Sequence, residues 1–135
     1  MASHWGHERE IPKKAGEILI EMDPEESVPV VLNFLDTPNI MSLVYMGIFF
    51  SVHADTALTL LIEKAEDPNS RIRSRALSYL GRLRDTRALE TCIKGLGHGS
   101  WRVRSSGAGA VGEMLDKKRL KDLIPMKVDQ GHSGI

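Results

Sequence analysis

Arginines at helical spacing are the most distinctive chemical feature of the chain. Arg71, Arg75 and Arg82 stand at intervals of four and seven residues, which at about 100° per residue places them in one narrow stripe of a helix. Guanidinium groups bind carboxylates through paired hydrogen bonds and are enriched at protein interfaces. The spacing therefore predicts a clamp for the acidic surface of another protein. The competing interpretation is a charged face that contacts only water.

Residues that could carry catalysis or hold a metal ion are few. Cys92 is the one cysteine and falls on the apolar stripe of a predicted helix, which favours a buried, unreactive thiol. The glycine-rich stretch 95–100 lacks the Gly-Lys pair of a phosphate-binding loop and is interpreted as a turn. The pair His7 and Glu8 lies outside the repeats described below. We therefore expect no enzyme activity, no cofactor and no metal site.

Charge is distributed unevenly along the chain. The formal net charge is 0, from 18 basic and 18 acidic residues. Residues 1–56 hold three basic and nine acidic side chains, giving −6, and residues 57–135 hold fifteen and nine, giving +6. The zero total counts against a dedicated nucleic-acid binder. The asymmetry favours a protein partner that is recognised by charge, and it also allows self-association between the acidic and basic halves.

Length and composition favour one globular domain. The chain has 135 residues, of which 41% are hydrophobic and 27% are charged, so wholesale disorder is excluded. One cysteine cannot form an internal disulfide, and no secretory signal is recognisable, so we expect a cytoplasmic protein.

One apolar segment is a candidate for insertion into a membrane. Its uncharged core, residues 40–52, is thirteen residues long, whereas a transmembrane helix needs about 20. We therefore predict a buried helix and no membrane contact. This helix is apolar nearly all round and must be covered, either by a helix at 9–23, which we favour, or by another chain.

An internal repeat organises the sequence. Residues 56–85 match residues 87–116 when the chain is shifted by thirty-one positions, which is typical of a helical repeat protein. Each unit is predicted to form two helices, with Asn69 and Ser100 as N-caps of the second helices. The predicted core positions of the two units are Leu58, Leu61, Ile62, Ala65, Ile72, Ala76, Leu80 and Leu83, then Leu89, Cys92, Ile93, Leu96, Val103, Gly107, Val111 and Met114.

The same register extends in both directions. Upstream it places Val30, Val31, Phe34, Met41, Tyr45, Phe49 and Val52 in the core, and downstream Leu120, Leu123 and Ile124. We predict an all-α fold, a right-handed α-α superhelix in a single domain (1–135). Its parts are an N-terminal cap helix (9–23, with Ala15, Ile18, Leu19 and Met22 inward), a degenerate repeat (25–55), two clear repeats (56–86 and 87–117), a half-repeat (118–127) and a tail (128–135).

The repeat register defines a partner-binding face. Positions equivalent to the arginine stripe hold Ile40 and Val44 in the degenerate repeat and Arg102 in the last repeat. Trp101 begins the last helix and is either a packed lid or an exposed interface anchor. In α-solenoids the second helices line the concave side. The predicted partner-binding residues are Arg71, Arg75, Arg82, Arg102, Trp101, Ile40 and Val44.

The repeat motif resembles a known family. Asp67, Ile72-Arg73, Ala76, Leu80-Gly81 and Asp85, repeated in part as Val103-Arg104, Val111-Gly112 and Asp116, look like the short HEAT-like repeat named after phycobilisome lyases. His98 and Gly107 depart from that pattern in the last repeat. The resemblance implies that Arg73 and Arg104 form a structural ladder with the inter-helix acid, here Asp67.

The resemblance also implies a type of function. We expect a non-catalytic scaffold that binds another protein through its arginine-bearing concave face. Two alternatives stay open: a subunit or chaperone of a bilin lyase, and a DNA-binding HEAT-like protein.

Overall fold

The computed structural model describes residues 13–115, and all of the regular structure in this part is helical. The helices are α1 (Lys13–Glu21), α2 (Pro24–Leu32), α3 (Ile40–Val52), α4 (Ala54–Lys64), α5 (Ser70–Leu83), the short 3-10 turn η3 (Thr86–Ala88), α6 (Leu89–Gly95) and α7 (Trp101–Met114). The all-α prediction is confirmed. The predicted half-repeat, 118–127, and the tail, 128–135, lie outside the described residues.

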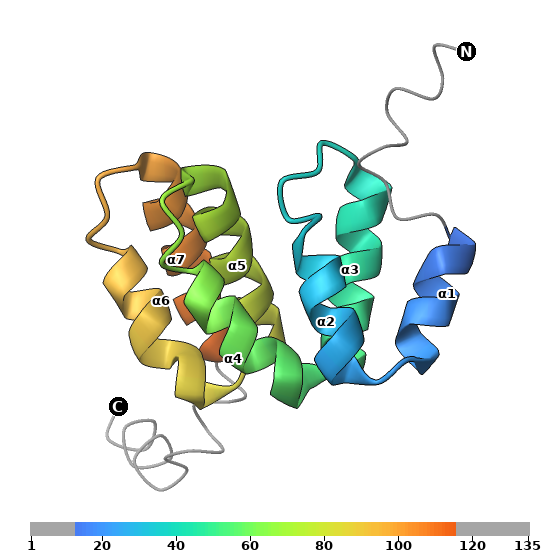
Figure 1. Ribbon diagram of the computed structural model, residues 1–135. Helices are drawn as coiled ribbons and strands as arrows, with labels where there is room; N and C mark the ends of the chain where they lie inside the picture. Colours follow the sequence, from blue (N-terminus) through green and yellow to red (C-terminus); the bar gives the residue numbers. More distant parts are fainter. Residues whose placement is uncertain (1–12, 116–135) are drawn as a thin grey trace, which may run out of the picture.

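The helices form successive pairs along the chain (Figure 1). The first helices of the pairs, α2, α4 and α6, lie on the side that faces the viewer, and the second helices, α3, α5 and α7, lie behind them. Helix α1 stands at the end of the array and contacts α2 and α3. This arrangement places α3, α5 and α7 on one face of the molecule.

Polar caps begin the second helices. The Asn39 side chain accepts a hydrogen bond from Ser42 N (2.8 Å) at the start of α3. Asn69, as predicted, accepts from Arg71 N (2.9 Å) and Ile72 N (3.3 Å) at the start of α5. Ser100 is the N-cap residue of α7, but its side chain makes no capping bond. The predicted capping role is therefore confirmed for Asn69 only.

The core runs along the middle of the array between the first and second helices. It contains Val28, Val31, Leu35, Met46, Phe50, Leu61, Ala76, Leu77, Leu80, Cys92, Val103, Ala110 and Met114, all nearly or fully buried. Every predicted core position of the 56–86 repeat is buried or packs against this cluster. Here the apolar stripes are narrow and flanked by charged residues, so the periodicity alone determines which face turns inward.

Outside that repeat, part of the predicted core is wrong. The residues predicted to be buried that are in fact exposed are Ile18, Met22, Val30, Met41, Val52, Ile93 and Leu96. In α3 the buried face consists of Ser42, Met46, Phe49 and Phe50 instead. For Met41 and Val52 the physical reason is that α3 is apolar nearly all round, so no polar residue fixes the face that turns inward.

Glycine lets α7 approach α5, at Gly81, and α6, at Gly107, closely. A Cβ atom on Gly81 would lie 2.6 Å from Ala110 Cα, and one on Gly107 would lie 3.0 Å from Cys92 O. No described residue comes within 4 Å of such an atom on Gly109 or Gly112. Gly81 and Gly107 therefore serve packing, whereas Gly109 and Gly112 do not contribute to it in the described part of the chain.

Arg73 and Arg104 close the turns between paired helices. Arg73 donates from Nε to Asp67 O (3.1 Å) and from Nη2 to Glu66 O (3.0 Å). Arg104 donates from Nη1 to the carbonyl oxygens of His98 (2.9 Å) and Gly99 (2.8 Å). The two arginines thus share one equivalent contact in successive repeats, to the carbonyl oxygens of Asp67 and His98. Arg73 reaches the backbone carbonyl of Asp67 rather than its carboxylate, which accepts from Asn69 N instead.

Cys92 gives the first testable consequence of this packing. The side chain is fully buried, and burial raises the pKa of the thiol to about 11. We expect the folded protein to react with Ellman's reagent at pH 8 at least about 100-fold more slowly than the urea-unfolded chain, because thiolate is scarce and shielded. Equal rates before and after unfolding would contradict this prediction.

Candidate functional site

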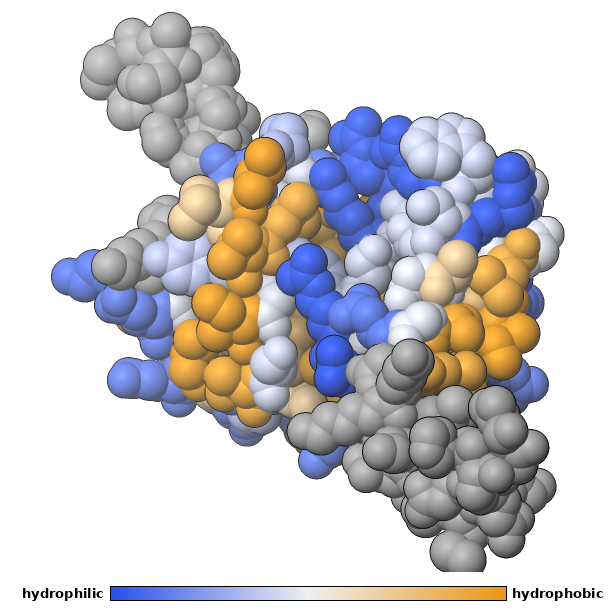
Figure 2. Space-filling model, turned by 180° about the vertical axis from the view of Figure 1, so that it is seen from behind, coloured by the Kyte–Doolittle hydropathy of each residue, from blue (hydrophilic) through white to orange (hydrophobic). Residues whose placement is uncertain are grey.

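The face formed by α3, α5 and α7 carries the predicted partner-binding residues. Figure 2 shows the molecule from this side, with a band of hydrophobic side chains next to a group of strongly hydrophilic ones. The band corresponds to exposed residues of α3, and arginines of α5 lie beside them around shared hollows. The face therefore combines an apolar strip with positive charge.

The apolar strip is a single row along α3. Ile40, Val44, Ile48 and Val52 are spaced by four residues, and their exposed fractions are 74%, 47%, 53% and 54%. We call these four residues the α3 row. The repeat register predicts Ile40 and Val44 on this face but not Ile48, although Ile48 continues the same spacing. Val52 was assigned to the core.

Helix α1 covers a different side of α3. Gly16, Leu19 and Ile20 line a small hollow with Tyr45, Met46 and Phe49. The carbonyl of Ile20 also lies 3.1 Å from Nε2 of His53, at the end of α3. The favoured prediction, that the N-terminal helix covers the open face of α3, is therefore wrong for the α3 row, since the row stays exposed beside a packed α1.

A groove separates α3 from α5. One part, of about 300 Å³, is lined by Ile40, Leu43 and Val44 from α3 and by Arg75, Ser78, Tyr79 and Arg82 from α5. A second part, of about 470 Å³, is lined by Val44, Gly47, Ile48, Ser51, Val52 and Arg82. The two parts share Val44 and Arg82. We call the combined hollow the α3–α5 groove: one wall is apolar and the other carries arginines.

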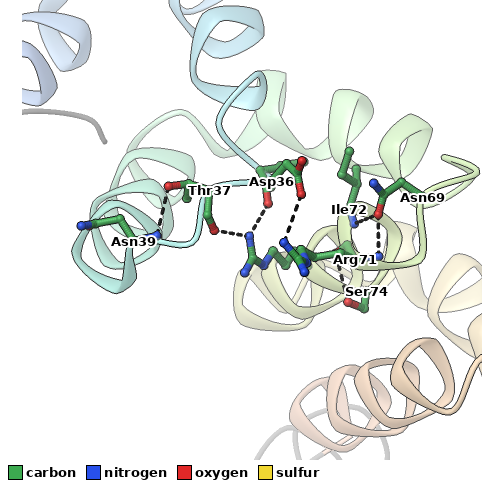
Figure 3. Close-up of polar contacts among 9 residues, drawn as sticks. Asp36, Thr37, Asn39, Asn69, Arg71, Ile72 and Ser74 are labelled. Atoms are coloured by element: carbon green, nitrogen blue, oxygen red, sulfur yellow. Dashed lines mark hydrogen bonds and ion pairs between the residues drawn. The ribbon is translucent and has the colours of Figure 1, made fainter. Parts of the chain in front are cut away.

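The three arginines of the predicted stripe on α5 occupy different environments. Arg71 reaches toward Asp36, with 3.6 Å between Nη1 and Oδ1 (Figure 3). Arg75 is half-buried and donates from Nη1 to the carbonyl oxygens of Leu35 (2.7 Å) and Thr37 (2.5 Å). Burial and the neighbouring Arg71 lower the pKa of Arg75. The prediction that the three arginines face solvent together is wrong for Arg75, which ties α5 to the loop before α3.

Arg82 is the arginine of the stripe that remains available. Its guanidinium carbon lies 5.9 Å from the centre of the Tyr79 ring, a distance at which a cation and an aromatic face attract each other. Among the described residues, Arg82 has no carboxylate within ion-pair distance. Within the described part of the chain, Arg82 therefore presents a positive charge without a carboxylate partner at the edge of the α3–α5 groove.

Trp101 and Arg102 extend the face onto α7. Trp101 is 69% exposed, so it is not a packed lid. Arg102 is also exposed and lies 6.0 Å from the centre of the Trp101 ring. Both residues line an open hollow of about 540 Å³ together with Arg71. Trp101 thus has the exposure that an interface anchor requires.

Tyr79 was not predicted as a residue of this face, yet it connects α5 to α3. Its hydroxyl donates to Leu43 O (2.7 Å), and its ring packs edge-on against Phe50 at 5.1 Å. Burial raises the pKa of Tyr79 to about 12. No sequence signal marks this role, because Leu43 lies 36 residues away in the chain.

Replacing Tyr79 by Phe gives the second testable consequence. At pH 8 we expect the free energy of unfolding to fall by about 1 kcal/mol through loss of the hydrogen bond to Leu43. Because the folded pKa is raised, the protonated hydroxyl stabilises the fold fully below pH 10, and this contribution is lost as pH rises from 10 toward 12. Because two pKa units correspond to about 2.7 kcal/mol, denaturation across pH 8–12 should show the wild type losing its advantage and then becoming less stable than Tyr79→Phe. Tyr45→Phe is the control, and a constant difference would contradict the prediction.

Metal binding and membrane crossing have no structural support among the described residues. None of their His, Cys, Asp and Glu side chains form a group of three able to hold a metal ion. Within the same residues, no helix has the length and apolar character needed to cross a membrane.

Comparison with known proteins identifies the architecture. Among curated proteins, none matches this chain. The family model for HEAT repeats matches residues 58–131, which is more than half of the chain. The matched segment begins within α4 and includes both clear repeats, whose paired helices are those of a helical solenoid. The chain therefore belongs to the HEAT-repeat family.

Proposed function

We propose that this protein is a non-catalytic scaffold that binds an acidic partner protein in the cytoplasm through the face of α3, α5 and α7. HEAT repeats generally mediate protein–protein interaction and are typically non-catalytic. The observation that carries the finer proposal is the pair Arg82 and Arg102, exposed on adjacent second helices. Neither has a carboxylate within ion-pair distance among the described residues.

The neighbouring side chains support the same proposal. The α3 row and Trp101 supply exposed apolar surface beside these charges. Interfaces typically combine buried aromatic and arginine anchors with a surrounding polar rim. Arg71 adds a third charge, held loosely by Asp36. Arg75 contributes by fixing the position of α5 relative to the loop before α3, rather than by reaching the partner itself.

Affinity capture followed by mass spectrometry tests this function. The tagged wild type is compared with Arg82→Glu/Arg102→Glu, and with the charge-matched control Lys64→Glu/Lys94→Glu on the opposite helices α4 and α6. We expect the control to retain the captured acidic protein and the Arg82/Arg102 variant to lose it. Retention by both variants would disprove the proposed face. Strongly salt-dependent capture of duplex DNA instead would favour nucleic-acid binding.

A further inference from the structure

Resting on this proposed function, we propose that the α3–α5 groove binds an amphipathic α-helix of the partner, with an apolar face against α3 and carboxylates along the flank that meets Arg82 and Arg71. The inference concerns the kind of segment that the partner contributes, and it follows from the shape, the apolar row and the charges of the groove.

The groove exists because α5 is drawn to α7 and held off α3. Gly81 allows close approach on the α7 side. On the α3 side, Tyr79 and Arg82 project from α5 toward Gly47: a Cβ atom there would lie 3.3 Å from Arg82 Nη1 and 3.5 Å from Tyr79 Cε1. These large side chains separate the two helices, and the space on either side of Val44 stays open.

The α3 row has the geometry of a ridge that packs against another helix. Residues four apart on a helix form such ridges, which fit between the side chains of a neighbouring helix. From Ile40 to Val52 the row rises about 18 Å, at about 1.5 Å per residue. A partner helix of about three turns would cover it, with apolar residues every three or four positions.

Two arginines determine the charge of this helix: Arg82, which lines the groove, and Arg71, which lies on the same stripe of α5 one turn before Arg75 and lines the hollow beside Trp101. Arg71 and Arg82 are eleven residues apart on α5, which corresponds to about 16 Å of rise. Two carboxylates eleven residues apart on a helix differ by only about 20° in direction, so one flank presents both. One would meet Arg82, and the other would compete with Asp36 for Arg71.

Two other occupants are less well matched to the groove. A flat membrane would touch the α3 row but would not fill the hollows beside Arg82. A second copy of the chain could offer the exposed residues Ile18 and Met22 of its N-terminal segment, flanked by Glu17 and Glu21. That apolar surface has two side chains, whereas the α3 row has four, so the second copy would leave part of the row uncovered.

The probe is a synthetic helical peptide of about four turns, with leucines every three or four residues and glutamates along one flank. The matched control peptide has lysine in place of each glutamate. Binding of the labelled peptides to the full chain is measured by fluorescence anisotropy. We expect the glutamate peptide to bind the wild type at least about tenfold more tightly than the lysine peptide, since each charge-assisted pair contributes about one decade of affinity.

Three variants locate the binding. Arg82→Glu should reduce the preference for the glutamate peptide by about tenfold or more, Ile48→Glu should abolish binding of both peptides, and Lys64→Glu should change neither. Ile48, Arg82 and Lys64 are at least partly exposed, so circular dichroism and melting should show intact folding. Equal affinity for the two peptides, no binding at about 1 mM, or indifference to Arg82→Glu and Ile48→Glu would overturn the proposal.

Two further measurements test the other two occupants, a membrane and a second copy of the chain. Sedimentation with phosphatidylserine vesicles that is lost in Ile48→Glu would assign the α3 row to lipid. A dimer seen by light scattering that is lost in the same variant would assign it to a second copy. Either outcome overturns the inference about a partner helix. The proposed function fails separately, through unchanged capture by Arg82→Glu/Arg102→Glu.

Discussion

Gly81→Val should lower the free energy of unfolding by about 2–3 kcal/mol, because the new side chain has no space between α5 and α7. A Cβ atom at position 81 would lie 2.6 Å from Ala110 Cα and 2.8 Å from Ala110 Cβ. The nearer atom is backbone and cannot rotate away, so the helices must separate, which typically costs 1–3 kcal/mol in a packed core. Urea denaturation followed by circular dichroism measures the difference.

Gly109→Ala is the matched control for Gly81→Val. Gly109 lies within α7, and no described residue is within 4 Å of the position of its Cβ. Alanine is favoured over glycine in a helix interior by about 1 kcal/mol, so this variant should be more stable than the wild type. If both substitutions destabilised the protein alike, close α5–α7 packing would not be the cause.

Arg75→Met should destabilise the protein by about 2–3 kcal/mol, which is the second large effect that we expect. Methionine retains much of the apolar stem but removes the charged donor that joins α5 to the carbonyl oxygens of Leu35 and Thr37. Hydrogen bonds from charged groups contribute about 1.5–3 kcal/mol each, and partial exposure of Arg75 reduces the sum.

Arg82→Met controls for the loss of a positive charge from α5. Arg82 is exposed and donates no hydrogen bond among the described residues, so its replacement should change stability by no more than about 0.5 kcal/mol. Hydrogen exchange should show faster opening of α2 and of the loop before α3 in Arg75→Met only. Equal losses of stability in the two variants would show that the tie to Leu35 and Thr37 contributes nothing.

The distinction between Arg75 and Arg82 determines how binding should be tested. Charge reversal at Arg75 would disturb the link between α5 and the first repeat, so a loss of binding could not be assigned to the surface. Charge reversal at Arg82 changes a group that lies beside Tyr79 and Gly47 and donates no hydrogen bond among the described residues. Binding experiments on this face should therefore use Arg82 and Arg102 and leave Arg75 intact.

A binding role for the groove would also explain why the α3 row is exposed on the outside of the array. An exposed row of large apolar side chains is unfavourable in isolation and typically marks an interaction site. Here the row lies beside an open hollow and beside Arg82, which has no carboxylate partner among residues 13–115. The combination suits a partner segment that is apolar on one face and acidic on its flank, as we propose.

The sequence by itself determined the helical class, the repeat period and most of the inward face of the clear repeats. Leu61, Ala76 and Leu80 are buried as predicted, because each lies on a narrow apolar stripe between charged residues. The N-cap at Asn69 was also predictable, since capping depends on residues two and three positions away. These features depend on local geometry, which repeats along the chain.

Only the tertiary structure decided which residues of α3 remain exposed and which arginine is free. In a helix that is apolar all round, Val52 and Phe49 are equivalent by sequence, and packing alone buries one and exposes the other. Arg75 and Arg82 look alike on a helix projection, yet Arg75 meets Leu35 from 40 residues away. Contacts between residues so distant in the chain depend on how the repeats stack, which helical periodicity does not specify.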